Sequence, residues 1–130
     1  MSPKSRVEAD GVAAPAGHYS HGIVVSGRTL YVAGQVALDE EGQLVGPGDA
    51  EAQTRQVLTN MERVVTAAGG QMADVARTTI YLTRLEDRAT VGAVRKEFFS
   101  DPPPANTLLV VTSLASPDFL VEIDAIVALP

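Results

Sequence analysis

Leu120-Val-Glu-Ile-Asp-Ala-Ile126, an apolar run close to the C-terminus, decides how the rest of the chain is interpreted. A strand has a period of two, so Glu122 and Asp124 would share one face while the apolar residues between them share the other. A carboxylate inside so apolar a strand costs free energy unless it has a partner or a task. Glu122 is therefore a candidate functional residue, and the alternative is a carboxylate on an edge strand that faces solvent.

Three prolines, Pro102 to Pro104, fix an extended entry into the same region and exclude a helix there. Leu108-Leu-Val-Val-Thr-Ser113 then has the length of a strand, and Ala115-Ser-Pro-Asp118 has turn chemistry. Asn106 opens this strand just after the prolines. It is the second candidate functional residue, with a simple turn residue after proline as the alternative.

Composition limits the class of protein. The 130 residues suffice for one domain, residues 1–130, and 45% hydrophobic with 20% charged residues is ordinary for a globular protein. No apolar run reaches the roughly 18–20 residues of a membrane-spanning helix, and Met1-Ser-Pro-Lys-Ser-Arg6 lacks the apolar core of a signal peptide. The absence of cysteine excludes disulfides, thiolate catalysis and cysteine-ligated metals. A cytoplasmic location, away from any membrane, fits these features.

The charge balance disfavours nucleic acid as a partner. Ten basic residues oppose 16 acidic ones, which gives a net charge of −6. Such a chain repels phosphate backbones unless its basic residues cluster, and Arg95-Lys96 is the only adjacent basic pair.

The remaining elements follow from periodicity and capping. Asp49 is a good N-cap, and the apolar stripe that follows it ends at Gly69-Gly70. The expected elements are an extended arm over 1–16, a hairpin of 23–26 with 29–37 around Gly27-Arg28, a helix after Asp49, a strand over 74–83, a helix over 85–99, and the two C-terminal strands.

This order, β-β-α-β-α-β-β, predicts an α+β fold in which two helices cover one face of a sheet. Several strands are apolar on most positions, and two helices cannot hide both faces of such a sheet. We therefore expect the other face to pack on further copies of the chain.

Four residues near the N-terminus and in the 29–37 strand invite a functional interpretation. His18 and His21 form an H-x-x-H, but on an extended segment they point to opposite faces, so two surface histidines are favoured over a metal site. Tyr19 between them would either line a pocket or pack at an interface. Gly34 indicates a bulge or a close approach to the backbone.

A set of short motifs, in this order and spacing, resembles the Rid family, the reactive-intermediate deaminases also called YjgF-like. The motifs run from about Ala14 to the C-terminus. They are Gly17-His-Tyr-Ser-His-Gly22, Val32-Ala-Gly-Gln-Val36, Ala67-Ala-Gly69, Asp74-Val-Ala-Arg-Thr-Thr79, Ala89-Thr-Val91, Phe98-Phe99, Pro104-Ala105 and Val121-Glu-Ile-Asp-Ala-Ile126.

The resemblance implies a chorismate-mutase-like α+β fold and a homotrimer with a small-molecule cleft between each pair of subunits. Typical members hydrolyse 2-imino and 2-enamino acids to 2-keto acids and ammonia without a cofactor. In them an arginine after Pro-Ala grips the substrate carboxylate, a glutamate of the last strand holds water, and a tyrosine and a glycine line the cleft.

Carried over position by position, the tyrosine corresponds to Tyr19, the glycine to Gly34 and the glutamate to Glu122. The arginine position is Asn106, which departs from the family pattern. An asparagine often found in the second helix is Gly92 here, and a small residue after the arginine is Leu108. The resemblance thus implies a cleft that is roomier near Gly92, more apolar near Leu108, and without its carboxylate clamp.

Three functions remain open at this stage. The first is a cofactor-free hydrolase that acts on a small imine or enamine other than a simple 2-imino acid, with Glu122 as the catalytic residue. The second is a non-enzymatic module that binds a metabolite in the same cleft. Ribonuclease activity, reported for some relatives, is opposed by the acidic charge. Arg28, Arg55 and Arg95 are candidates to reach the cleft from a neighbouring chain.

Overall fold

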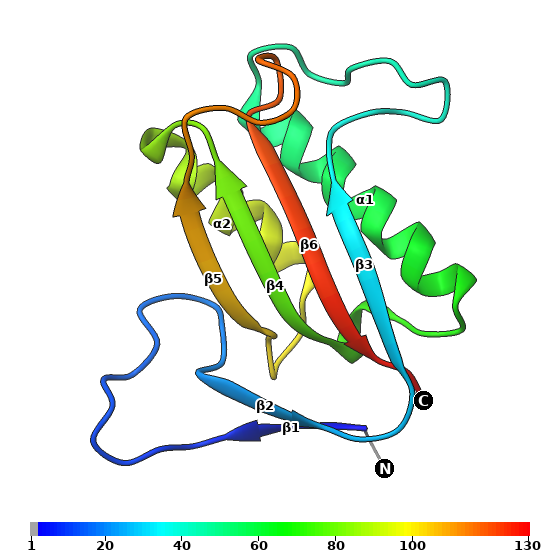
Figure 1. Cartoon of the computed structure of the whole chain (residues 1–130). Coiled ribbons are helices and arrows are strands. Elements are labelled where there is room, and N and C mark those ends of the chain that lie inside the picture. The colour runs from blue at the N-terminus through cyan, green and yellow to red at the C-terminus, as the bar shows by residue number, and fades with distance from the viewer. Residues whose placement is uncertain (1–2) are drawn as a thin grey trace.

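Two helices cover one face of a four-stranded sheet in the computed structural model of the chain, which describes residues 3–130 (Figure 1). A separate two-stranded ribbon lies below the sheet in this view. The elements are β1 (Lys4–Val7), β2 (Gly22–Val25), β3 (Thr29–Gln35), α1 (Ala50–Ala67), β4 (Val75–Leu82), α2 (Arg88–Phe98), β5 (Ala105–Val110) and β6 (Val121–Ala128), with short 3-10 turns at Met72–Asp74 and Leu85–Asp87.

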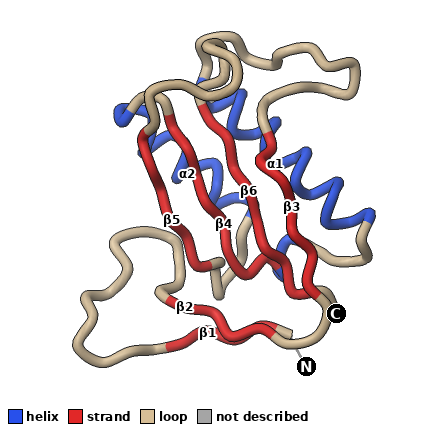
Figure 2. Tube along the Cα trace, viewed as in Figure 1, coloured by secondary structure: helices blue, strands red, loops and turns tan. Residues whose placement is uncertain are grey.

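The predicted α+β class is confirmed, and β6 proves to be an inner strand. The strand order is β3-β6-β4-β5, with β6 antiparallel to both neighbours and β4 parallel to β5 (Figure 2). The edge-strand alternative for Glu122 is therefore wrong. Asn106 lies inside β5, so the turn-residue alternative for it is wrong as well.

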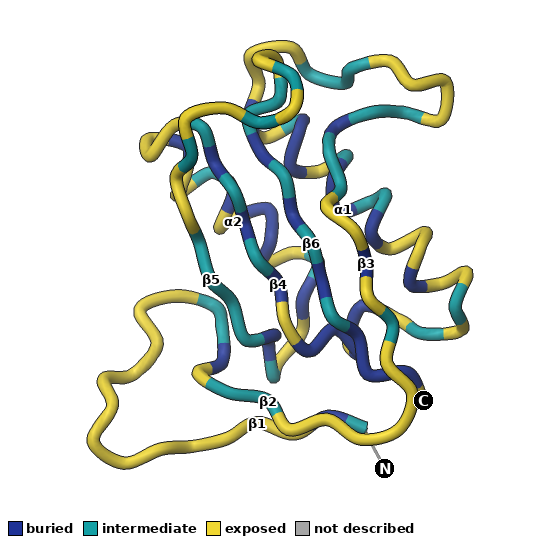
Figure 3. Tube along the Cα trace, in the orientation of Figure 1, coloured by how far each residue is buried: buried dark blue, intermediate teal, exposed yellow. Residues whose placement is uncertain are grey.

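The alternation of β6 organises the core. Val121, Ile123 and Ala125 are at most 3% exposed on the helix side, while Glu122 and Asp124 are half-buried on the other side (Figure 3). We call that other side of the sheet the open face, because neither helix covers it (Figure 1). The helices supply the opposite wall of the core through Val57, Leu58, Met61, Val65, Val91 and Val94.

The predicted hairpin of residues 23–26 with 29–37 is wrong. The turn exists, since Gly27 has a φ of +84°, but β2 pairs with β1 while β3 pairs with β6. The segment predicted as an extended arm thus supplies the missing strand, and its first two residues lie outside the described range. Lys4 docks it on the body by donating from Nζ to the carbonyls of Val75 (2.7 Å) and Pro102 (3.1 Å).

The helix boundaries follow the capping chemistry. Asp49 caps α1 as predicted, because its side chain accepts from the Ala52 amide at 3.0 Å. Gly69, with a φ of +91°, turns the chain beyond the C-terminal end of α1. The second helix starts three residues later than predicted, because Leu85–Asp87 forms a 3-10 turn before α2. No helix within residues 3–130 has the length and hydropathy needed to cross a bilayer.

Gln53, fully buried on α1, fixes the entry into β6. Its Nε2 donates to the carbonyls of Gly46 (3.1 Å) and Asp118 (3.0 Å), and its Oε1 accepts from the Leu120 amide (2.8 Å). One side chain therefore joins α1 to two loops and holds the residue that lies two positions before Glu122.

Replacing this side chain by an apolar one of similar size should be costly. We expect Gln53→Leu to lower the free energy of unfolding by about 2 kcal/mol, because three partly buried backbone groups and the buried Gln53 site lose their hydrogen bonds. Urea unfolding measures the change. Gln43→Leu is the matched control, since Gln43 is exposed and its side chain makes no hydrogen bond among the described residues; it should change stability by less than about 0.5 kcal/mol. Equal effects of the two variants would contradict the assigned role of Gln53.

Candidate functional site

A cavity of about 260 Å³ lies where α2 meets β4 and β5 on the helix side of the sheet. Four of the residues singled out from the sequence meet there: Tyr19, Gly92, Asn106 and Leu108. The other lining residues are Gly17, His18, Ile80, Arg88 and Arg95. We call this cavity the α2–β5 cavity.

Strand register brings Asn106 and Leu108 to this cavity. Parallel pairing places Asn106 beside Thr78 and Leu108 beside Ile80, and both partners on β4 are buried toward the helices. A Cβ added to Gly92 would meet nothing within 4 Å, so the glycine leaves open space at the helix side of the cavity. The expectations of room near Gly92 and of an apolar wall near Leu108 agree with this geometry.

A chain of hydrogen bonds connects Asn106 to a buried guanidinium. The Thr78 hydroxyl donates to Asn106 Oδ1 at 2.7 Å, and Nη2 of Arg95 donates to the same Thr78 oxygen at 3.3 Å. Nη1 of Arg95 donates to the His18 carbonyl at 2.9 Å. The guanidinium of Arg95 therefore lies behind Asn106, on the far side of the Thr78 hydroxyl.

Arg95 is an unusual charge in its surroundings. It is 4% exposed, it lies over the Phe99 ring at 5.3 Å, and no carboxylate among residues 3–130 pairs with it. Its Nε is buried and has no hydrogen-bond partner among the described residues. Burial lowers the pKa of Arg95 to about 10, which leaves the guanidinium charged at neutral pH.

The sequence had suggested Arg95 only as a residue reaching across from a neighbouring chain. The structure instead places it in the cavity of its own chain. A signal was present in the sequence, because Arg88, Gly92 and Arg95 follow the i, i+4, i+7 spacing of one helical face.

Glu122 occupies a different face, and Gly34 lies against it. A Cβ on Gly34 would overlap Oε2 of Glu122 and would lie 2.8 Å from its Cδ and 3.0 Å from its Cγ. The β3–β6 register also shifts between Val32 and Gln35. Both meanings proposed for Gly34, a bulge and a close approach, are therefore confirmed.

The surroundings of Glu122 on the open face are polar. Tyr81 on β4 is its cross-strand neighbour, and the Tyr81 hydroxyl donates to Oδ2 of Asp124 at 3.1 Å. This hydrogen bond to Asp124 raises the pKa of Tyr81, because it favours the protonated phenol. A water molecule on this face would lie near the Glu122 carboxylate, the Tyr81 phenol and the backbone of Gly34, which carries no side chain.

One chain does not bring the predicted site together. Asn106 shares the face of its partner Thr78, whereas Glu122 shares the face of its partner Tyr81, and alternate residues of β4 point to opposite sides. Asn106 and Glu122 therefore belong to opposite faces of the same sheet.

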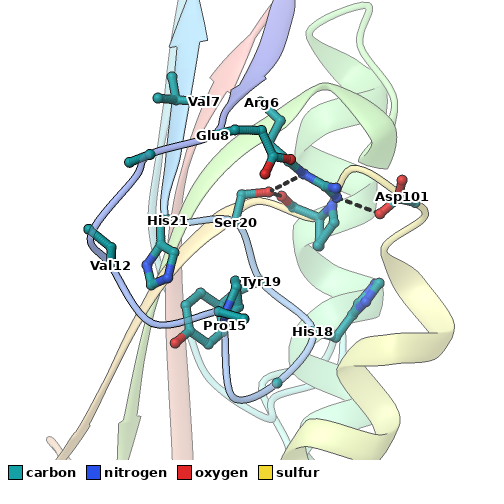
Figure 4. A pocket seen from close by; sticks show the side chains of 14 residues that line it. Arg6, Val7, Glu8, Val12, Pro15, His18, Tyr19, Ser20, His21 and Asp101 are labelled. Carbon is teal, nitrogen blue, oxygen red and sulfur yellow. Dashed lines mark hydrogen bonds and ion pairs between the residues drawn. The ribbon is translucent and has the colours of Figure 1, made fainter.

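A second, larger hollow of about 460 Å³ lies under the N-terminal segment (Figure 4). Arg6 pairs with Asp101 at its edge, and Tyr19, whose ring meets His21 edge-on at 5.7 Å, lines this hollow as well as the α2–β5 cavity. The two histidines bond separate backbone oxygens, His18 that of Phe99 and His21 that of Ala13.

Comparison with known proteins places this geometry in a family. A family model described as Endoribonuclease L-PSP matches residues 11–129. A RutC family protein of Sulfurisphaera tokodaii is 40% identical over 112 residues, which are 86% of this chain and 88% of that protein. A crystal structure of the Rid family protein YyfB of Yersinia pestis superimposes with a TM-score of 0.86 at 35% identity, covering 98% of this chain and 99% of that one.

The chain belongs to the Rid family.

A further Rid relative carries a chemical name. A protein of Dermatophagoides farinae called 2-iminobutanoate/2-iminopropanoate deaminase is 33% identical over 129 residues, 99% of each chain. At the positions that the resemblance singled out, this chain has Tyr19, Gly34, Asn106 and Glu122, and their roles stay predictions.

The contact between Gly34 and Glu122 can be tested by a double-mutant cycle. Gly34→Ala should destabilise the chain by about 1 kcal/mol, because the new methyl group displaces the Glu122 side chain. In a Glu122→Ala background the same substitution should cost much less, which gives a coupling energy of about 0.5 kcal/mol or more by urea unfolding. Gly92→Ala is the matched control, because the new Cβ would meet nothing within 4 Å. An identical cost of Gly34→Ala in both backgrounds would contradict the contact.

Proposed function

We propose that the protein forms a homotrimer whose intersubunit clefts process a small imine or enamine, without a cofactor. One observation carries this proposal: the Glu122 carboxylate lies against Gly34 on the open face, while Tyr19 and Asn106 line a cavity on the opposite side of the sheet. A complete cleft then needs the open face of one copy and the α2–β5 cavity of another. The named deaminase activity of the Dermatophagoides farinae relative supports this reaction class.

The open face offers surface for such an assembly. On this face, Tyr31 of β3 is 75% exposed and Leu109 of β5, the neighbour of Tyr81, is 45% exposed. Apolar side chains gathered on an uncovered sheet favour association with another protein surface. Closed cyclic symmetry would bury each open face against the next copy, as the trimer requires.

In the proposed reaction Glu122 handles protons and water. A water molecule held by the carboxylate adds its oxygen to the carbon of the C=N bond and gives a proton to Glu122. That proton then passes to the nitrogen, which gives a carbinolamine. Glu122 next transfers the hydroxyl proton to the same nitrogen as the C–N bond breaks, so the products are ammonia and a carbonyl compound. Gly34 leaves the space in which the carboxylate takes up this position.

Asn106 limits which substrate suits the cleft. A charge-assisted hydrogen bond is worth roughly 1.5–3 kcal/mol against about 1 kcal/mol for a neutral one. Without the arginine fork at this position, a simple 2-imino acid should bind about one to three orders of magnitude more weakly than to an arginine-bearing relative.

Two other functions are weighed against this one. The departure at Asn106 also suits a non-enzymatic module that binds a metabolite in the same cleft, with Glu122 only as a hydrogen-bond acceptor. Ribonuclease activity is suggested by the description of the family model, but the net charge of −6 opposes RNA binding, and three copies multiply that charge.

The trimer is tested by analytical ultracentrifugation at micromolar concentration. We expect a single species of three times the chain mass, because the site is split between two faces of the sheet. A stable monomer would contradict the trimer and the intersubunit cleft together.

Imine hydrolysis is tested with 2-iminopropanoate generated in place by an amino-acid oxidase. The wild-type protein should accelerate its loss little, and Asn106→Arg should raise the rate because a guanidinium regains the carboxylate fork. Asn106→Arg with Leu108→Cys should raise it further if Leu108 crowds the new side chain. Asn106→Lys is the control that restores charge without the fork.

Two results would overturn this account of Asn106. One is wild-type hydrolysis as fast as that of an arginine-bearing relative. The other is that both arginine variants remain folded trimers, bind a carboxylate ligand and stay inactive, in which case the binding module is favoured.

RNA cleavage should be absent from preparations freed of contaminating nucleases. The net charge of −6 opposes the binding of a phosphate backbone. Cleavage that follows the protein through several columns and disappears in Glu122→Ala would refute this prediction.

A further inference from the structure

One face of α2 presents two arginines to the α2–β5 cavity. Arg88 and Arg95 lie seven residues apart, roughly 10 Å along the helix axis, with Gly92 between them. Since a Cβ at Gly92 would meet nothing within 4 Å, the helix surface between the two guanidinium groups is open. This face could therefore admit a ligand between the two charges.

The cavity holds positive charge that the described chain does not neutralise. Among residues 3–130, no carboxylate lines the cavity and no ion pair involves Arg88 or Arg95. Arg95 is more than nine-tenths buried and its Nε lacks a partner there, although a buried charge is costly unless it is paired. That such a charge persists in a chain with a net charge of −6 indicates that its counter-charge comes from outside the chain.

We propose that the α2–β5 cavity binds the carboxylate of a small organic acid through Arg95 and Arg88 on α2. This inference deepens the proposed function and rests on it only in taking the same cleft as the ligand site. The volume of about 260 Å³ and the apolar walls of Ile80 and Leu108 suit an acid with a short hydrocarbon chain.

Asn106 supplies the second recognition group. The distance of 2.7 Å from the Thr78 hydroxyl to Asn106 Oδ1 is typical of O–H···O geometry, and Thr78 already accepts from Arg95. The amide oxygen of Asn106 is thus engaged, and its NH₂ group is left to donate to an uncharged acceptor on the ligand.

The spacing of these groups defines the ligand class. Nη2 of Arg95 and Oδ1 of Asn106 are joined through the Thr78 hydroxyl by hydrogen bonds of 3.3 and 2.7 Å, so a single small ligand can reach both side chains. The ligand is therefore an acid that carries an uncharged acceptor within a few atoms of its carboxylate.

Matched acid and amide probes test this site without any catalysis. Isothermal titration calorimetry would compare 4-oxopentanoate with 4-oxopentanamide, which differ in the charge at one end. We expect the wild-type protein to bind 4-oxopentanoate at least tenfold more tightly than the amide.

Substitutions on α2 test which cations bind the ligand carboxylate. Arg95→Met should weaken 4-oxopentanoate binding at least tenfold and leave the amide unchanged, while the protein stays folded because a buried unpaired charge is replaced by an apolar side chain of similar length. Arg88→Ala, on the exposed rim, should weaken it about threefold. Lys96→Met, which removes an exposed cation outside the cavity lining of α2, should have no effect.

Three outcomes would overturn the proposal. They are no binding of 4-oxopentanoate to the wild-type protein at millimolar concentration, equal affinity for acid and amide, and unchanged affinity in Arg95→Met. If Arg95→Met dissociates the oligomer while the wild-type protein binds no acid, the counter-charge is a carboxylate of a second copy. Binding of the acid without any imine hydrolysis would leave this site intact and refute only the proposed reaction.

Discussion

Strand β6 pairs with β3 on one side and β4 on the other, so its side chains alternate between the helix layer and the open face. The buried set, of which Ile123 is fully covered, fixes the strand against α1 and α2. Because side chains alternate along a strand, burial of that set against the helices places Glu122 and Asp124 on the open face. The position of the candidate catalytic carboxylate is thus a consequence of core packing.

Two local devices refine that position. Gln53 ties the residues just before β6 to α1 through three hydrogen bonds, and Gly34 removes the one Cβ that would collide with the carboxylate. On the opposite side of the sheet, β4 pairs Thr78 with Asn106 and so connects the site to Arg95. The sheet therefore holds Glu122 on one face and Asn106 on the other, and in the proposed oligomer a second copy of the chain would bring them together.

The sequence predicted whatever depends on local periodicity or on a cap. The alternation around Glu122 and the cap at Asp49 depend on neighbours along the chain, and the structure confirms both. The close approach at Gly34, predicted from the glycine itself, is confirmed by its contact with Glu122 on another strand. The predicted pairing of residues 23–26 with 29–37 was wrong. Gly27 does form a turn, but β2 pairs with β1, which lies in a segment without any apolar pattern. The spacing of Arg88, Gly92 and Arg95 marks one face of α2, but the place of Arg95 beside Asn106 also depends on how far α2 lies from β5, which is a tertiary distance.

The most direct test of the account is whether Glu122 of one copy meets the α2–β5 cavity of another. The chain has no cysteine, so Gly92→Cys and Glu122→Cys can be introduced together and treated with a short thiol-specific cross-linker. The account predicts covalent dimers and trimers on a denaturing gel from the double variant, and covalent dimers when the two single variants are refolded together, but not from either single variant alone. Cross-linked species that remain monomeric, or no cross-linking in a protein shown to be a folded oligomer, would contradict it.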